Sequence, residues 1–265
     1  MSSDKTEWLA SATEDGVVHF RVGRRGESVV AEWVDYGTLV ASRDGQHWEL
    51  TFADGVPEPQ RDKLRKGGAR VLLSQLRGEL ALHGAAVGIA GRAVVLVGAS
   101  GAGKSTLAAA LCARGATMLA DDAVSLRVTP RTSTVEPTEA LHWLDAASCT
   151  ALSLPARPLE DAKAAIPAAR IAEEALPIAA VIELAWSDAP LGITRAGAIE
   201  SIARLLPHVG RILVDSPERH RRELDQLTTL FESAPLCTLS RPRDFRALGD
   251  AVHQLVDLAS RQGGE

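Results

Sequence analysis

Several features that would mark a particular class of protein are scarce in this chain. Its 265 residues include only three cysteines, Cys112, Cys149 and Cys237, which are far apart and odd in number. They support neither a disulfide framework nor a zinc site. Basic residues number 29 against 34 acidic ones, which gives a formal net charge of -5. Proteins that bind nucleic acid broadly have a basic excess, so the charge argues against this function.

Long apolar runs are also missing from the sequence. No window reaches the ~18 apolar residues that a membrane span needs, because Gly, Arg, Asp or Pro interrupts every run. The first residues, Met1 to Thr6, are polar and unlike a signal peptide. Hydrophobic residues nevertheless make up 46% of the chain, which is enough to build a core. We therefore expect a soluble, cytoplasmic protein with no membrane partner.

The beginning of the chain is rich in β-forming residues. Turns containing Gly and Asp separate short runs, until Pro57 and Pro59 break the pattern. The expected strands are 17–22, 28–34, 37–41 and 47–52. We interpret residues 1–58 as a small antiparallel β-rich region, with edge strands of the main sheet as the alternative. Residues 59–265 then form the main domain.

The later part of the chain alternates between short apolar runs and helical patterns, which is typical of an α/β domain. We expect strands at 93–97, 117–120, 179–184 and 211–214, and helices at 70–78, 104–113, 199–206, 218–231 and 245–259. Residues 130–177 are rich in Ala and Pro and carry few periodic signals. We interpret this stretch as a mobile segment.

Residues 98–105 read Gly-Ala-Ser-Gly-Ala-Gly-Lys-Ser and match the P-loop pattern G-x-x-x-x-G-K-[ST] at every fixed position. Glycines let successive backbone N–H groups point into one anion-sized hollow, and the helix that follows adds its N-terminal dipole. The lysine supplies a charge for the β- and γ-phosphates, and the serine hydroxyl can ligate Mg²⁺. The residues expected to bind the nucleotide are Gly98, Ala99, Ser100, Gly101, Ala102, Gly103, Lys104, Ser105 and Thr106.

A histidine is expected beside this loop. Residues 83–89 and 93–97 form a predicted hairpin around the two-residue turn Ala90-Gly91. Paired positions across such a turn have a constant sum, here 181, which sets His83 opposite Gly98. A structural role for this histidine remains the alternative.

An acidic pair is expected at the same rim. Asp121 and Asp122 follow the predicted strand 117–120, and a right-handed crossover makes that strand parallel to 93–97. Ligands of open α/β sheets collect at the carboxyl ends of the strands. One carboxylate can hold Mg²⁺, and the other can accept a proton from an attacking hydroxyl. The alternative for this pair is a solvated turn or a helix cap.

Three segments resemble the catalytic domain of HPr kinase/phosphorylase and its wider kinase group. They are Leu82-His83-Gly84, residues 98–106 and residues 119–124, in the family's order and at similar spacing. The strand ending near Trp186 also looks like a later family strand. The resemblance implies the α/β fold shared with phosphoenolpyruvate carboxykinases. It further implies ATP and Mg²⁺ as cofactors, and it allows a homo-oligomer.

Carried over by position, the resemblance makes Asp121 the catalytic base and His83 the residue that orients it. Ser105 and Asp122 would serve Mg²⁺. The Arg-Gly-Leu-Gly signature of the bifunctional family is absent between Arg127 and Pro177. The chain therefore looks more like an HPr-kinase-related stand-alone kinase. Lys163 and Arg170 are candidates for the missing positive charge, although solvated surface positions are the ordinary interpretation of both.

These observations predict an ATP-dependent serine kinase that phosphorylates a hydroxyl of a protein or peptide. A small-molecule kinase would use the same chemistry on another acceptor. A generic P-loop ATPase is a further alternative, in which Asp215 ends a Walker B strand at 211–214. A nucleotide-sensing module without catalysis is the last.

Overall fold

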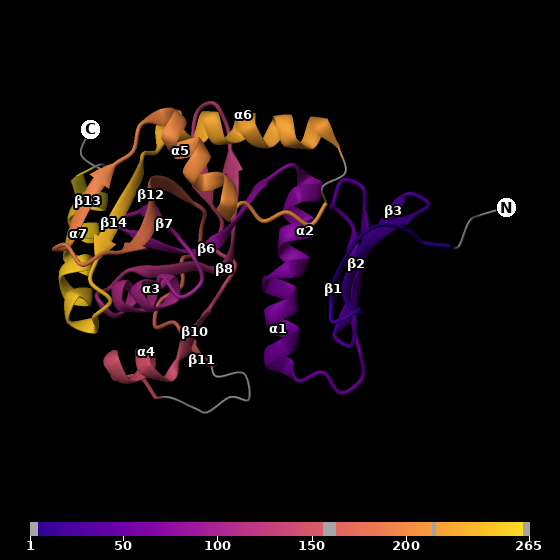
Figure 1. Ribbon diagram of the computed structural model, residues 1–265, viewed down its shortest axis with the longest axis horizontal. Helices are drawn as coiled ribbons and strands as arrows, with labels where there is room; N and C mark the ends of the chain where they lie inside the picture. Colours follow the sequence, from indigo (N-terminus) through magenta and orange to yellow (C-terminus); the bar gives the residue numbers. More distant parts are fainter. Residues whose placement is uncertain (1–4, 156–162, 214–215, 262–265) are drawn as a thin grey trace. The chain divides into compact units, whose positions relative to one another are not determined.

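The computed structural model describes residues 5–155, 163–213 and 216–261 (Figure 1). The chain divides into two compact units. The first comprises residues 1–81 and 210–223, and the second comprises residues 82–209 and 224–265. The sequence placed a boundary between residues 58 and 59, whereas the first unit continues through two helices. The assignment of residues 1–58 to a β-rich region and of residues 59–265 to the catalytic domain stays a prediction.

The first unit contains a five-stranded antiparallel sheet in the order β1-β2-β3-β4-β5. Its strands are β1 (Glu7–Glu14), β2 (Val17–Arg25), β3 (Ser28–Trp33), β4 (Gly37–Ser42) and β5 (Trp48–Phe52). The expected antiparallel β-rich region is therefore confirmed as a sheet separate from the main one. The sequence did not indicate β1, whose residues are all exposed.

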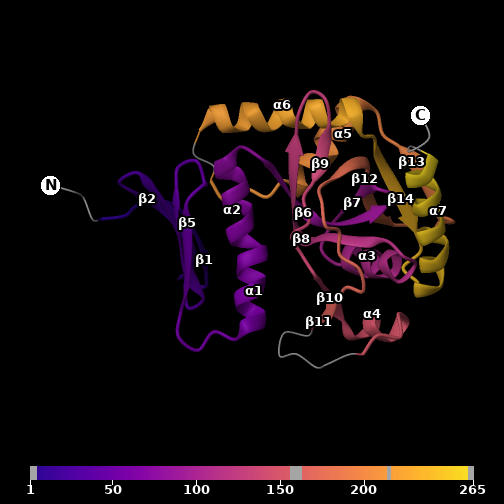
Figure 2. The same cartoon turned by 180° about the vertical axis from the view of Figure 1, so that it is seen from behind.

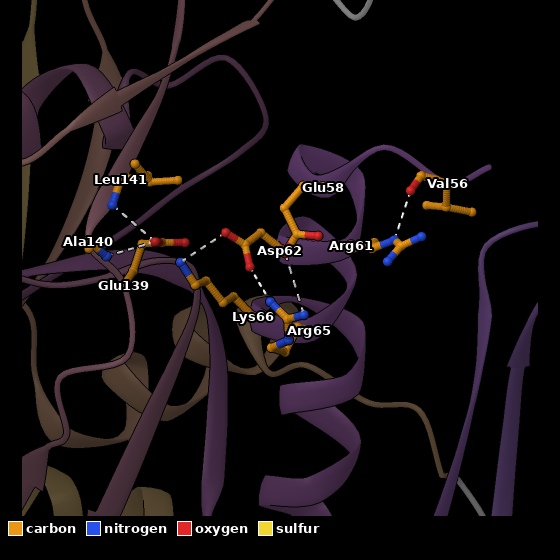
Figure 3. Close-up of polar contacts among 9 residues, drawn as sticks. All are labelled: Val56, Glu58, Arg61, Asp62, Arg65, Lys66, Glu139, Ala140 and Leu141. Atoms are coloured by element: carbon orange, nitrogen blue, oxygen red, sulfur yellow. Dashed lines mark hydrogen bonds and ion pairs between the residues drawn. The ribbon is translucent and has the colours of Figure 1, made fainter. Parts of the chain in front are cut away.

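Two helices follow this sheet, α1 (Glu58–Lys66) and α2 (Gly68–Arg77). Helix α1 is amphipathic and strongly charged, and Arg65 pairs with Glu58 and Asp62 along its surface, as Figure 3 shows. The apolar side of α2 supplies Leu72, fully buried with the β-sheet valines in one core. Apolar burial of this kind, rather than helix propensity, stabilises short helices.

The second unit is built on a mixed seven-stranded sheet in the order β13-β14-β12-β7-β6-β8-β9. The strands are β6 (Leu80–Ile89), β7 (Arg92–Val97), β8 (Thr117–Val128), β9 (Ser133–Val135), β12 (Leu176–Trp186), β13 (Gly192–Arg195) and β14 (Leu236–Arg241). Strand β12 runs parallel to both β7 and β14, whereas β6 is antiparallel to β7. The predicted α/β class is confirmed.

Helices α3 (Lys104–Ala113) and α7 (Leu248–Arg261) cover one face of this sheet. Their apolar side chains share a core with alternate residues of β7, β12 and β14. Helix α5 (Ala198–Leu205) contacts the other face, because Arg204 pairs with Glu183 and Thr238, which alternate with the core residues. Figure 2 shows α3 and α7 near β7 and β14 from behind.

The remaining elements are β10 (Leu141–Asp145), α4 (Ala146–Ala151), β11 (Lys163–Pro167), η1 (Leu206–His208), α6 (Pro217–Ser233) and η2 (Phe245–Ala247). Strands β10 and β11 form a separate antiparallel pair. The stretch 130–177, interpreted as mobile, thus contains three short strands and a helix. Residues 211–213 are not a strand, while Val214 and Asp215 lie outside the described residues.

Cys112, Cys149 and Cys237 are free and buried. Among the described residues, no helix is long and apolar enough to cross a membrane.

Candidate functional site

The P-loop sequence occupies the turn between β7 and α3. Strand β7 is buried from Ala93 to Val97, and residues 98–103 then reverse the chain into the helix. Gly101 and Gly103 have φ of 78° and 85°, which side chains rarely allow. The strand–loop–helix context expected from the sequence is therefore present, and the N-terminus of α3 follows the loop directly.

Lys104 lies over this loop. Its Nζ donates to the carbonyl oxygens of Gly98, at 2.9 Å, and Ala99, at 3.2 Å. Burial lowers the pKa of Lys104, while the nearby charges of Asp121 and Asp122 raise it. The ammonium group of Lys104 is therefore close enough to both carboxylates to interact with them electrostatically.

Asp121 is the buried member of the acidic pair, with 4% of its surface exposed. Its Oδ1 accepts a hydrogen bond from the hydroxyl of Ser105, at 2.9 Å, and its Oδ2 accepts one from the backbone N–H of Trp143, at 3.3 Å. Burial raises the pKa of Asp121 to about 6, against the opposing effect of these hydrogen bonds. The hydrogen bond from Ser105 therefore joins this carboxylate to the first turn of α3.

Asp122 faces a different environment. Its side chain is 49% exposed, and its Oδ1 lies 3.4 Å from Nδ1 of His83. The same Nδ1 lies 3.1 Å from the backbone oxygen of Asp122. A carbonyl oxygen can only accept, so Nδ1 is the donor in this contact. His83 was expected to orient Asp121, but its imidazole contacts Asp122.

The acidic pair lies inside strand β8 rather than after it. The predicted strand ended at Ala120, whereas β8 continues to Val128: residues 123–126 are all buried, and residues 126–128 pair with β9. Asp122 has a φ of 71°, an unusual conformation for a residue other than glycine. Neighbouring residues of a strand point to opposite faces, and the two carboxylates accordingly have different partners.

The hairpin expected between β6 and β7 is confirmed. Ala85 pairs with Leu96 and Ile89 pairs with Arg92, so the positions sum to 181 as predicted. Ala90 and Gly91 both have positive φ, as a two-residue hairpin turn requires. This register brings the strand of His83 beside the strand that leads into the loop.

The site also includes residues that the sequence did not indicate. His208, in η1, is half-buried, and this burial lowers its pKa. The charges of Lys104 and His83 lower the pKa further, whereas the charge of Glu183 raises it. Trp143 contributes only a backbone N–H from β10. No sequence signal marks either residue, because both reach the site through long-range folding.

The two candidate cations differ in position. Arg170 donates to the carbonyl oxygen of Gly115, beyond the C-terminal end of α3, whereas the loop is at the other end of that helix. Lys163, exposed at the start of β11, is close enough to lower the pKa of Lys104. Only Lys163 thus stays a candidate for the predicted charge.

The oxygens of Ser105 and Asp121 suit Mg²⁺, which prefers hard oxygen ligands and is often held by one or two protein groups together with phosphates. Among the described residues, no group of three or more His, Cys, Asp or Glu side chains could hold a metal without such help. The donor set therefore fits a metal that arrives with a nucleotide.

Comparison with known proteins bears on this part of the chain. The family model described as HPr Serine kinase C-terminal domain matches residues 74–144. This segment is HPr-kinase-like. It contains His83, the loop and both aspartates, so the resemblance stated from the sequence is confirmed at the level of the family.

A solved HPr(Ser) kinase/phosphatase from Coxiella burnetii also matches the chain. The identity is 12%, the match covers 68% of this chain and 94% of that one, and the TM-score is 0.36. No curated protein matches the chain closely enough to serve as a relative.

Proposed function

We propose that the protein is an ATP-dependent kinase that transfers the γ-phosphoryl group to a serine hydroxyl of a protein or peptide. One observation carries the proposal: beside a P-loop, Asp121 bonds to Ser105 while Asp122 pairs with His83. A carboxylate on the loop serine suits a metal, and an exposed carboxylate with an imidazole suits proton transfer. The two functions of a kinase site are thereby divided between neighbouring residues.

The contacts favour a division of roles opposite to the one carried over from the family. We assign Asp121, with Ser105, to the magnesium side and Asp122, with His83, to the acceptor side. An acceptor hydroxyl can reach a half-exposed carboxylate, whereas Asp121 is buried under its hydrogen bonds. Lys104 then neutralises phosphate charge from the loop.

In the proposed step, the acceptor oxygen forms a bond to the γ-phosphorus while the bond from that phosphorus to the β–γ bridging oxygen breaks. The acceptor proton passes to the carboxylate of Asp122, and ADP leaves with the electron pair of the broken bond. The N–H of His83 holds that carboxylate in position. Mg²⁺, when bound with the nucleotide, would neutralise phosphate charge. Positioning and charge stabilisation supply most of the catalysis.

The test is incubation of the protein with γ-labelled ATP, Mg²⁺ and a library of serine-containing peptides, with the label located by mass spectrometry. We expect phosphoserine in a subset of peptides. Label found only in small molecules would show that the acceptor is a small molecule and not a peptide. Label found only in free phosphate would indicate an ATPase. Unchanged ATP would contradict the proposal altogether.

Paired variants test the division of roles. Asp122→Asn should retain ATP binding and slow transfer by roughly 100- to 10,000-fold, the usual contribution of a general base. Asp121→Asn should instead raise the Mg²⁺ concentration needed for half-maximal transfer. If Asp121→Asn removed transfer at every Mg²⁺ concentration and Asp122→Asn did not, the roles would return to those implied by the family.

A further inference from the structure

A buried arginine lies on the other side of the P-loop from the acidic pair. Arg241, the last residue of β14, is 3% exposed. Its Nε is buried and has no hydrogen-bond partner among the described residues, and no ion pair of its guanidinium is found there. Burial lowers the pKa of this arginine, with no carboxylate to oppose the effect. A buried charge without a partner is costly, so the site is suited to an anion that is not part of the chain.

The guanidinium lies against the loop itself. A Cβ added to Gly103 would be 2.6 Å from Nη2 of Arg241 and 3.6 Å from the ring of Trp186. A side chain at Gly103 would therefore have to displace the guanidinium, and the φ of 85° at this position would strain it as well. Arg241 therefore contacts the residue immediately before Lys104, at the anion-binding end of α3.

Trp186 holds the guanidinium in place. It ends β12 and is paired in register with Arg241 of β14. The Cζ of Arg241 lies 4.2 Å from the centre of the Trp186 ring, within the range of a cation–π contact. The indole is 37% exposed, so this pair is at the edge of the unit rather than deep in its core.

The strand order of the sheet shows on which side of the P-loop Trp186 and Arg241 lie. Strand β7, which leads into the loop, lies between β6 and β12. His83 and the acidic pair are on the β6–β8 side, whereas Trp186 and Arg241 are on the β12–β14 side. A nucleotide with its terminal phosphate toward the acidic pair must extend its remaining phosphates toward the other side.

We propose that Arg241, held by Trp186, binds the α- and β-phosphates of the nucleotide on the β12–β14 side of the loop. The inference rests on the proposed binding of ATP and deepens it. A guanidinium matches two phosphate oxygens with parallel N–H groups, which an ammonium cannot do. Trp186 is a positioning residue for this ligand.

The principal variant is Arg241→Met, which keeps most of the volume and removes the charge. We expect ADP and inorganic tripolyphosphate, measured by calorimetry, each to bind about 10- to 100-fold more weakly. Arg241→Lys should recover only part of the affinity. Arg246→Met is the matched control, because the Arg246 side chain is 92% exposed and pairs with Asp244; it should bind like the wild type.

Unfolding and fluorescence separate a ligand from a structural support. Without nucleotide, Arg241→Met should be at least as stable as the wild type, because the buried charge is gone. ADP should change the tryptophan fluorescence of the wild type, and Trp186→Phe should remove that change. If the methionine variant did not fold, weak binding by a folded Arg241→Lys variant would still support the inference.

Three results would overturn the inference. The first is unchanged binding of ADP and tripolyphosphate by Arg241→Met when the wild type binds both. The second is a loss confined to ADP, which would indicate contact with the nucleoside instead. In the third, the wild type binds neither ligand; this result would refute the proposed function, and the inference with it.

Discussion

Single residues decide the chemistry that this chain can support, and burial separates residues of similar type. Asp121 and Asp122 adjoin in the sequence, yet one is buried on Ser105 and the other is half-exposed beside His83. The P-loop motif predicts a strand before the loop and a helix after it, and the structure has both. The division between the aspartates follows from their place inside β8, whereas the sequence predicted a strand that ended at Ala120.

A second buried residue predicts how stability depends on pH. His142 is 3% exposed, its Nδ1 has no partner among the described residues, and burial lowers its pKa to about 4. Because the pKa is 6.5 in the unfolded chain, unfolding takes up a proton below that value. Stability should be complete above pH 6.5 and should fall progressively toward pH 4, by about 3 kcal/mol.

The measurement is denaturant unfolding of the wild type and of His142→Leu at pH 7.5, 5.5 and 4.5. The variant should lose less stability on acidification than the wild type. His253→Leu is the control, because His253 is exposed on α7. Parallel curves for the wild type and His142→Leu would show that His142 does not cause the acid sensitivity.

Among the elements, the β6–β7 hairpin is the one that the sequence predicted in most detail. A two-residue turn with positive φ fixes the register, so local information was sufficient. The neighbours of the hairpin were not predictable in this way. β12 and β8 flank it through pairings between distant residues, and the strand β10, which supplies the N–H of Trp143, lies in a stretch with little periodic signal.

The hairpin also explains why glycine follows the histidine. A Cβ added to Gly84 would be 2.5 Å from the backbone oxygen of Leu96, on the opposite strand. Gly84→Ala must therefore push β6 from β7 and displace His83 relative to the loop. We expect a loss of about 1–3 kcal/mol in the free energy of unfolding, together with slower phosphoryl transfer.

Chemical denaturation and transfer rates would test this. Gly249→Ala is the matched control, because a Cβ added at Gly249 in α7 meets nothing within 4 Å. The control should be neutral or slightly more stable. A Gly84→Ala variant with the stability and rate of the wild type would mean that the close approach of the strands is not needed.

Over the whole molecule, the chain returns to its first unit after forming most of the second. Residues 210–223 belong to the first unit, and the side chain of Gln75 binds them there. Its Oε1 accepts hydrogen bonds from the backbone N–H groups of Ile212, at 2.8 Å, and Leu213, at 3.0 Å. The apolar residues at 211–214 suggested a strand, but the N–H groups of Ile212 and Leu213 bond to the Gln75 side chain and not to a neighbouring strand.

Replacing this glutamine tests the importance of the return. Gln75→Leu would leave two backbone N–H groups without their acceptor in a buried place, so we expect a loss of about 2–3 kcal/mol in the free energy of unfolding. The same substitution at Gln254 of α7 should have little effect. Equal stability of the two variants would show that the returning segment does not depend on Gln75.

The most direct test of the central claim is a crystal structure of the protein with Mg²⁺ and a non-hydrolysable ATP analogue. We predict the metal on the hydroxyl of Ser105 and the terminal phosphate facing Asp122 and His83. A terminal phosphate directed toward β12 and β14, away from the acidic pair, would contradict the assignment of this site to phosphoryl transfer.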